Sequence, residues 1–237
     1  MIDLTLKEIA DIVGGQLDSV DDPQARVTGF VEFDSRKVTP GGLFLCFPGA
    51  KVDGHDFAHK AVEQGAVAVL AARPVGVPAI VVKPTGRMAG DGANADIYAN
   101  DSDGSAAAVV RALSSLAHFV TDKLTADADL SIIGVTGSAG KTSTKDLIAT
   151  ILRQDGETVA PPGSFNNEIG HPYTALRCGE DTKYLVAELS ARGIGHIKHL
   201  TDIATPRIGV VLNVGTAHLG EFGSRENIAQ AKGELVE

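Results

Sequence analysis

The chain has 237 residues, a formal net charge of −9 and a hydrophobic share of 43%. This length fits one large or two modest domains with sizeable cores, and the composition is that of a globular protein. The negative charge argues against binding to nucleic acid or an anionic membrane, because both attract basic surfaces. The chain has no long apolar run and no basic start followed by an apolar segment, so we expect a cytoplasmic protein.

Residues 1–84 alternate short helical and strand patterns, which predicts a small α/β domain. In this segment we expect helices at 6–13 and 57–64 and strands at 27–33, 43–47, 66–71 and 77–82. The two cysteines, Cys46 and Cys178, are far apart and lack the spacing of metal ligands. The sequence therefore predicts two reduced, buried thiols.

Residues 85–105 are rich in glycine, aspartate and asparagine, and we expect a loop or linker there with the domain boundary inside it. Residues 106–237 then form a second domain, entered through a helix at 105–124. Its expected strands are 130–135, 158–160, 184–188 and 207–213, and its expected helices are 141–152 and 225–236. This alternation predicts a doubly wound, mostly parallel sheet.

The segment Thr136-Gly-Ser-Ala-Gly-Lys-Thr142 joins a β-branched strand to a helix N-terminus. Backbone N–H groups, the helix dipole and the Lys141 charge make such a junction a phosphate cradle, and Thr142 can offer its hydroxyl to magnesium. Val135 stands where the longer P-loop pattern has glycine, so the motif is a shorter form. The alternative is an ordinary turn with a surface lysine. We expect a nucleoside triphosphate site formed by Gly137, Ser138, Ala139, Gly140, Lys141, Thr142 and Ser143.

Two side chains with metal-binding chemistry follow strands of the second domain. Glu188 ends the strand at 184–188, and His218 follows the strand at 207–213. Ligands bind at the carboxyl ends of parallel strands, so both would reach a metal near Thr142. The alternative for Glu188 is an ion pair at the sheet end. Asn166 and Asn167 lie in a glycine-bounded loop, where asparagine serves equally as a turn former or as an amide contact for a ligand.

In the first domain, Asp34-Ser35-Arg36 stands where a strand runs into a loop. Arg36 has the chemistry to hold a phosphate or carboxylate, and Ser35 to bond a base or sugar edge. Spacing alone leaves a solvated turn with an ion pair as the alternative.

With these pieces in place, the chain resembles the Mur ligase family of cell-wall amide-forming enzymes. The matching stretches span nearly the whole chain in the family's order: Phe33-Asp-Ser-Arg-Lys-Val-Thr-Pro-Gly-Gly42, Gly54-His-Asp-Phe57, Thr136-Gly-Ser-Ala-Gly-Lys-Thr142, Asn166-Asn-Glu-Ile-Gly170, Glu188, Ala217-His-Leu-Gly-Glu-Phe-Gly-Ser224 and Ala231-Lys-Gly-Glu234. Within the family, the likeness favours the type that adds D-alanyl-D-alanine to UDP-N-acetylmuramoyl-tripeptide. The resemblance thus implies an ADP-forming ligase of peptidoglycan precursor synthesis that uses ATP and Mg²⁺.

The resemblance also implies roles for individual residues. Ser35 and Arg36 would help hold the uridine diphosphate part of the substrate, and residues 1–84 would be the domain that binds it. Lys141 would bind the β- and γ-phosphates of ATP. Asn166 and Asn167 would line the nucleotide or substrate cleft.

Four residues would carry the metal chemistry, namely Thr142, Glu188, His218 and Lys232. Lys232 matches a lysine that such ligases often carry as a carbamate, which supports a second metal. Lys141, Glu188, His218 and Lys232 are thereby the expected catalytic residues. ATP would first phosphorylate the substrate carboxylate to an acyl phosphate, which an amine then attacks.

One departure from the family pattern concerns the length. Family members have a third, C-terminal domain that holds the incoming amine substrate, whereas this chain stops within or just after a helix of the central domain. We therefore expect a fragment with an incomplete central domain and no ligase turnover of its own, and an exposed sheet edge that favours association. For the protein itself we expect a monomer. The rival interpretations are a diaminopimelate- or lysine-adding ligase of the same family, a P-loop kinase or GTPase, and a non-catalytic nucleotide-binding module.

Overall fold

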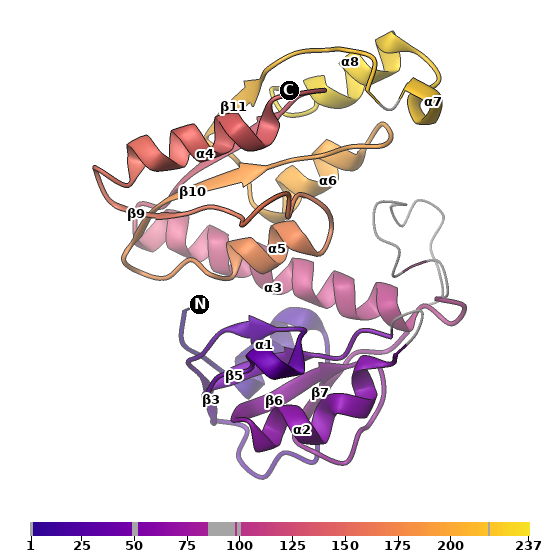
Figure 1. Cartoon of the computed structure of the whole chain (residues 1–237). Coiled ribbons are helices and arrows are strands. Elements are labelled where there is room, and N and C mark those ends of the chain that lie inside the picture. The colour runs from indigo at the N-terminus through magenta and orange to yellow at the C-terminus, as the bar shows by residue number, and fades with distance from the viewer. Residues whose placement is uncertain (1, 49–51, 85–97, 99–100, 218) are drawn as a thin grey trace. The chain divides into compact units, whose positions relative to one another are not determined.

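The computed structural model describes residues 2–48, 52–84, 98, 101–217 and 219–237. By its internal contacts the chain separates into two compact units, residues 1–116 and 117–237 (Figure 1). The domain boundary within residues 85–105 stays a prediction, because most of that segment lies outside the described residues. The overall class is the α/β architecture that the sequence predicts.

The first unit is built on a five-stranded sheet of order β2-β7-β6-β5-β4, in which β4 to β7 are parallel and β2 is antiparallel to β7. The strands are β2 (Gln16–Asp18), β4 (Val31–Glu32), β5 (Gly42–Leu45), β6 (Ala66–Ala71) and β7 (Ala79–Val81). A separate two-stranded sheet pairs β1 (Leu4–Thr5) with β3 (Arg26–Val27). The helices are α1 (Leu6–Val13) and α2 (Ala58–Glu63), with 3₁₀ turns η1 (Ser35–Lys37) and η2 (Gly54–Phe57).

The predicted helix at 6–13 is confirmed, and its ends show why it forms there. Thr5 and Glu8 make a capping box, in which each side chain satisfies the other's backbone N–H. Gly14 ends the helix in the left-handed conformation, with φ of 64°. In the parallel core next to it, Phe44, Cys46 and Val69 pack against α2. Strands of a parallel sheet are covered on both faces, which is why the runs at 43–47 and 66–71 read as uniformly apolar.

The predicted single strand at 27–33 is wrong, since the chain changes sheets inside it. Arg26–Val27 pairs with β1, whereas Val31–Glu32 pairs with β5. Between them, the N–H groups of Thr28 and Gly29 both donate to the Gly41 carbonyl, at 3.0 and 2.8 Å. A Cβ on Gly29 would lie 2.7 to 2.8 Å from the backbone of residues 40–42, so this crossing requires glycine. The β-branched pattern alone could not reveal the switch.

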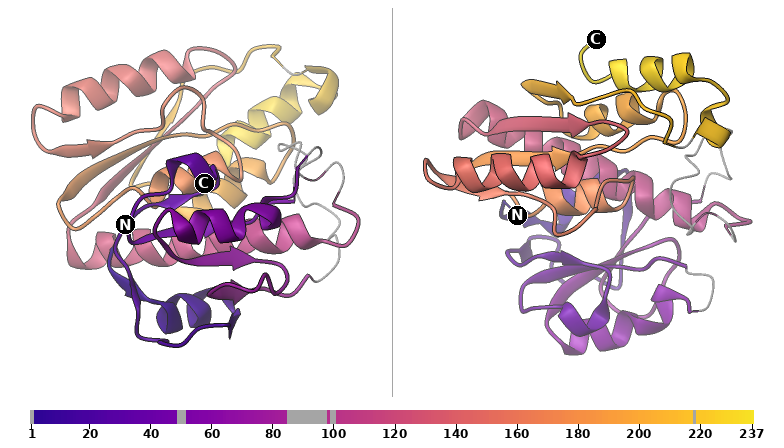
Figure 2. Two further views of the ribbon diagram at one scale, coloured as in Figure 1. Left: turned by 60° about the horizontal axis from the view of Figure 1, so that its bottom comes forward. Right: turned by 45° about the horizontal axis from the view of Figure 1, so that its top comes forward.

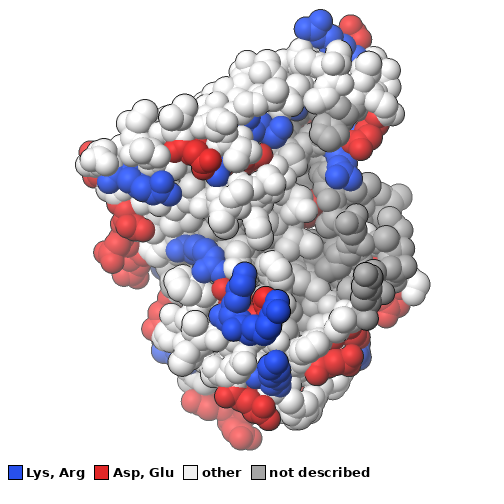
Figure 3. All heavy atoms as spheres, viewed as in Figure 1, with Lys and Arg blue, Asp and Glu red and all other residues white. Residues whose placement is uncertain are grey.

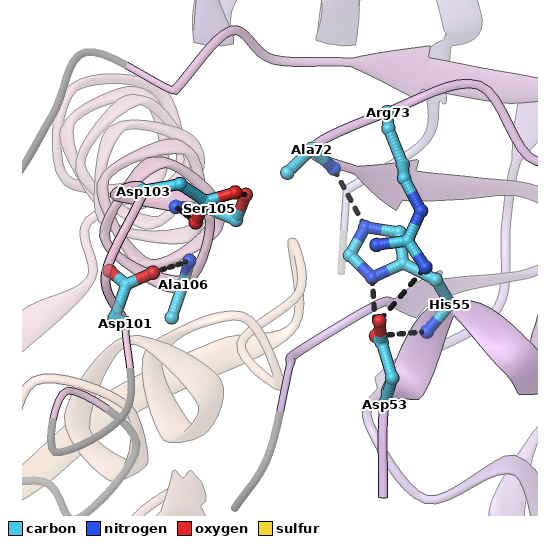
Figure 4. Close-up of polar contacts among 8 residues, drawn as sticks. All are labelled: Asp53, His55, Ala72, Arg73, Asp101, Asp103, Ser105 and Ala106. Carbon is cyan, nitrogen blue, oxygen red and sulfur yellow. Dashed lines mark hydrogen bonds and ion pairs between the residues drawn. The ribbon is translucent and has the colours of Figure 1, made fainter.

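Helix α3 (Ser105–Asp127) begins in the first unit and ends in the second. Its N-terminus is capped by two aspartates, as Figure 4 shows. The Asp101 carboxylate accepts from the N–H groups of Ala106 and Ala107, both at 2.9 Å, and Asp103 accepts from that of Ser105 at 3.0 Å. The two carboxylates stabilise this end of the helix, because they accept hydrogen bonds from its free N–H groups and interact favourably with the helix dipole.

The second unit is built on a parallel four-stranded sheet of order β11-β8-β10-β9. The strands are β8 (Ser131–Thr136), β9 (Glu157–Val159), β10 (Thr182–Glu188) and β11 (Ile208–Val211). Around them lie α4 (Lys141–Leu152), α5 (Gly170–Ala175), α6 (His196–Ile203), α7 (Leu219–Phe222) and α8 (Arg225–Gly233), seen from two further sides in Figure 2. The predicted helix at 225–236 is thus shorter, and α5 to α7 were not predicted.

Helices cover this sheet on both faces, as the doubly wound prediction requires. Ile133, Val135 and Val186 pack against Ala149 of α4 on one face. On the other face of β8, the position of a Cβ on Gly134 lies within 3.0 Å of Leu235, which follows α8, and of Pro206. The two thiols also agree with prediction, since Cys46 and Cys178 are free and buried, and burial raises the pKa of each to about 12.

Among the described residues, no helix is both long and apolar enough to cross a membrane. On the face shown in Figure 3, acidic and basic side chains are interspersed over much of the surface.

Candidate functional site

The phosphate loop of the second unit lies between β8 and α4, where the sequence predicted it. Gly140 precedes the helix at φ of 83° and Gly137 starts the loop at φ of 159°, a conformation open to glycine. The first N–H groups of α4, from Lys141 onward, have no partner within the helix and point toward its N-terminal end. They offer donors to an anion, and the helix dipole adds to the attraction.

The loop is held by an asparagine that sequence analysis missed. The Asn213 Oδ1 accepts from the N–H groups of Ser138 and Ala139, at 3.0 and 3.1 Å, and its Nδ2 donates to the Ala139 carbonyl at 3.1 Å. The Ser138 hydroxyl in turn accepts from the N–H of Gly215 at 2.9 Å. Asn213 follows β11, at the same sheet edge as Glu188, and that position was the signal that could have identified it.

Lys141 lies over its own loop, with Nζ donating to the Gly137 carbonyl at 2.8 Å. Lys145, one turn further along α4, is 1% exposed, and its ammonium donates to the carbonyls of Pro161 and Gly163 at 2.7 and 3.3 Å. It also pairs with Asp146. The two lysines therefore have different tasks: Lys145 fastens the segment after β9, and Lys141 stays beside the loop.

Glu188 ends β10 and is 1% exposed. It pairs in register with Val135 of β8, so its side chain is at the edge from which the phosphate loop leaves. One oxygen, Oε1, accepts from the Asn166 amide at 2.7 Å. The other, Oε2, is buried and has no hydrogen-bond partner among the described residues.

A buried carboxylate oxygen without a partner is costly, and a bound cation is one way to compensate it. Glu188 and the Thr142 hydroxyl are both hard oxygen donors, which suits magnesium. No group of three His, Cys, Asp or Glu side chains that could hold a metal occurs among the described residues. His218, predicted as a further ligand, lies outside them.

Lys232 of α8 is 4% exposed. Burial, followed by repulsion from the Lys141 charge, lowers the pKa of its amine to about 8. The Lys232 amine is thus buried and is affected by a lysine of the phosphate loop that is 91 positions away in the sequence.

The two predicted asparagines have different surroundings. Asn166 contacts Glu188, as described, and its Oδ1 also accepts from the Ser190 hydroxyl at 3.0 Å. Asn167 Oδ1 accepts from the N–H groups of Ile169 and Gly170, at 3.2 and 2.9 Å, just where α5 begins. Asn167 therefore acts as a turn former, and Asn166 orients the carboxylate.

In the first unit, Ser35 and Arg36 line a pocket of about 520 Å³ at the carboxyl ends of β4 and β5. Ser35 is buried, and the Arg36 side chain is 80% exposed. The guanidinium donates to both oxygens of Asp34, at 2.9 and 2.8 Å. These side-chain hydrogen bonds, followed by one from the Arg36 backbone N–H, lower the pKa of Asp34 to about 2. The ion pair that the sequence left as an alternative is therefore present, at the edge of a pocket.

Sequence analysis did not identify the other walls of this pocket. Aromatic rings and one more cation line it, namely Phe33, Phe44, Phe47, Phe57 and Lys60. The rings of Phe33 and Phe47 are tilted by 59° with centroids 6.2 Å apart. A pocket with flat apolar walls and two cations suits a planar ring that carries an anionic group.

Two family models match the chain: the Mur ligase middle domain over residues 135–237, and the model described as Mur ligase family, catalytic domain, over residues 28–120. Curated relatives named UDP-N-acetylmuramoyl-tripeptide–D-alanyl-D-alanine ligase are 61% identical in Mycobacterium leprae and 36% in Escherichia coli K12, each over 99% of this chain. The chain covers 46% and 45% of those two relatives, so it spans just under half their length.

Solved structures agree with this result. A crystal structure of MurF from Acinetobacter baumannii matches with a TM-score of 0.77 and 30% identity, over 98% of this chain and 46% of that one. The MurF ligase of Thermotoga maritima in complex with ADP matches with a TM-score of 0.68 and 32% identity, over 89% of this chain and 43% of that one. The two family models and these structures show that the chain belongs to the Mur ligase family.

Proposed function

We propose that this chain supplies the UDP-substrate pocket and the ATP site of a ligase that joins D-alanyl-D-alanine to UDP-N-acetylmuramoyl-tripeptide. The observation that carries the proposal is the buried Glu188 carboxylate at the sheet edge from which the phosphate loop leaves. The chain is 60–61% identical to mycobacterial relatives of that name. The Thermotoga maritima neighbour is a complex with ADP, which supports a nucleotide-binding role for this chain.

In this proposal ATP phosphorylates the substrate carboxylate to an acyl phosphate, and the amine of D-alanyl-D-alanine then displaces phosphate to form the amide. Lys141 and the first N–H groups of α4 hold the transferring phosphate and offset its charge. Thr142, Glu188, His218 and Lys232 are the residues that would hold Mg²⁺. The metal would offset repulsion between the phosphate and the attacking carboxylate. Asn166 fixes the orientation of Glu188 in this arrangement.

The first-unit pocket is the proposed site of the uridine diphosphate part. Uracil would lie against the phenylalanine rings, and Arg36 and Lys60 would face the diphosphate. Asp34 keeps the Arg36 guanidinium oriented, so less side-chain freedom is lost when the anion binds.

The proposal is tested by titrating this chain calorimetrically with UDP-N-acetylmuramoyl-tripeptide, with UDP-N-acetylglucosamine and Mg·ATP as comparisons. We expect selective binding of the muramoyl peptide, weakened about fivefold to tenfold by Arg36→Ala through loss of a charge-assisted contact. Arg26→Ala is the matched control, since Arg26 is an exposed arginine of the same unit that pairs with Asp3, away from the pocket. ATP binding without muramoyl-peptide binding would show that the substrate is different.

Lys232 is proposed to carry a carbamate when the enzyme is active. Its neutral amine attacks CO₂, forming an N–C bond and releasing one proton, and the product is an anionic metal ligand. With a pKa of about 8, about half of the amine is neutral at pH 8, far more than for an ordinary lysine. In ¹³C-bicarbonate we expect a carbamate carbon signal in the NMR spectrum that weakens as pH falls from 8 to 6 and is absent in Lys232→Gln. An unmodified Lys232 at saturating bicarbonate would refute the proposed carbamate.

A further inference from the structure

The segment Gly54-His-Asp-Phe57 is part of the family likeness, but the proposed function gives its histidine, His55, no task. It lies directly beside the first-unit pocket, which Val52, Gly54 and Phe57 help to line. The N–H of Gly54 donates to the Phe47 carbonyl at 2.8 Å. A Cβ on Gly54 would lie 2.6 Å from the backbone N and O of Phe47, so the segment packs tightly against the residues after β5. The shape of the pocket therefore depends on how this segment is held in place.

His55 is the centre of that support (Figure 4). Its side chain is 1% exposed, which is unusual for a histidine next to a ligand pocket. The ring Nε2 accepts from the N–H of Ala72, just after β6, at 3.0 Å. The ring Nδ1 lies 2.6 Å from the Asp53 Oδ1, which also accepts from the His55 N–H at 3.0 Å. One imidazole thus links this segment to the carboxyl end of a central strand.

The two ring contacts determine which ring nitrogen of the imidazole carries the proton. A backbone N–H only donates, so Nε2 must be the acceptor, and Nδ1 must carry the hydrogen that it donates to Asp53. The ring is therefore used as a neutral spacer of fixed length between a carboxylate and a strand end. A side chain that offers only one of these two atoms would leave either the Asp53 carboxylate or the Ala72 N–H without its partner.

Asp53 is anchored in turn. Its Oδ2 accepts from the Arg73 guanidinium at 2.8 Å. Burial tends to raise the pKa of Asp53, but the hydrogen bonds from His55 and Arg73 outweigh it and bring the pKa down to about 2. The carboxylate is thus ionised at every pH at which the protein would work. Asp53, His55 and Arg73 form a chain of polar contacts that reaches from the pocket wall to β6.

We propose that Asp53 and His55 are positioning residues of the first-unit pocket, holding the wall formed by Val52, Gly54 and Phe57 in the shape that accepts the UDP-substrate. The inference rests on the proposed function, because it takes this pocket to be the substrate site. Neither residue lines the pocket. They act through the backbone between them and determine substrate affinity without touching the phosphate loop.

The test uses variants that each keep one of the two ring contacts. His55→Asn places an amide near the Nδ1 position and keeps the contact with Asp53, whereas His55→Gln places its amide oxygen near Nε2 and keeps the contact with Ala72. His55→Ala keeps neither. By calorimetry we expect affinity for UDP-N-acetylmuramoyl-tripeptide to fall at least tenfold in His55→Ala and by an intermediate factor in the other two. Affinity for Mg·ATP should stay within twofold of the wild type in all of them.

The control is His171→Asn in the second unit. His171 is equally buried, and its ring Nε2 lies 3.0 Å from the Leu200 carbonyl. Loss of this contact should lower the thermal midpoint and leave muramoyl-peptide affinity unchanged. Asp53→Asn, which keeps the side-chain shape, should weaken the same affinity. It provides the test if the His55 variants fold poorly. Wild-type affinity in folded His55→Ala or Asp53→Asn would overturn the inference alone. Absence of muramoyl-peptide binding by the wild type would instead refute the proposed function, and the inference with it.

Discussion

Replacing Lys141 with methionine is expected to lower the rate of the proposed ligase on the order of 10²–10³-fold, as for loss of one preorganised charge at a reacting anion. The side chain lies over the phosphate loop, with Nζ donating to the Gly137 carbonyl at 2.8 Å, which places its charge beside the proposed phosphate. Methionine retains the length and most of the apolar contact of lysine. The rate is measured as ADP release in protein of the relatives' full length, and Mg·ATP affinity is measured on this chain.

Lys198→Met is the matched control for this prediction. Lys198 lies on α6, where its exposed ammonium pairs with Asp202, and its loss should change neither the rate nor the affinity. Unchanged Mg·ATP affinity and ADP release in Lys141→Met would show that the loop is an ordinary strand-to-helix turn, the alternative that the sequence left open.

The same variant should also change Lys232. The Lys141 charge is the second cause of the lowered pKa at Lys232, after burial, so its removal raises that pKa from about 8 toward the ordinary lysine value without reaching it. More of the amine is then protonated at pH 8, and less carbamate forms from the neutral remainder. Part of the rate loss in Lys141→Met would therefore result from reduced carbamate formation on Lys232, which is 91 positions away in the sequence.

Much of the fold follows from local patterns. The helix at 6–13, the strand at 66–71 and the glycine loop before Lys141 lie where apolar periodicity and turn chemistry indicate. The strand at 27–33 was wrong because which sheet a strand joins depends on long-range packing, here the close approach of Gly29 to Gly41. Helices α5 and α7 have 6 and 4 residues and carry too few turns for their spacing to be recognised. Helix α6 is as long as the helix at 6–13, but its N-cap residue is Gly195, which lacks the capping side chain that marks the start of that helix.

The site was predictable to the extent that its residues lie at strand ends. Glu188 and the phosphate loop share one sheet edge because their strands are parallel neighbours, which topology rules alone indicate. Asn213 meets the same criterion but has no charge or motif to single it out. Asp53 and His55 could not be assigned from sequence, because their partner Ala72 offers only a backbone N–H that any residue would provide.

The second large effect is expected for Glu188→Gln, which should lower the ligase rate about 10²–10³-fold while leaving the metal-free protein as stable as before or more stable. The glutamine can still accept from Asn166 through Oε1, so the loop contact at 2.7 Å is kept. What is lost is a buried negative charge whose second oxygen has no partner among the described residues. Removing such a charge favours folding by about 1 kcal/mol, although the buried amide nitrogen left in its place offsets part of this.

A lower ligase rate together with unchanged or higher metal-free stability distinguishes a metal ligand from a structural glutamate. Thermal midpoints are measured with and without Mg·ADP, and the wild type should be stabilised by the metal nucleotide far more than Glu188→Gln. Glu157→Gln, an exposed glutamate of the adjacent strand β9, controls for the substitution and should change neither quantity. If Glu188 instead served only to hold Asn166, the variant would keep its response to Mg·ADP and its rate, because that hydrogen bond survives. A loss of activity together with preserved or raised metal-free stability is the pattern expected of a carboxylate kept for a cation.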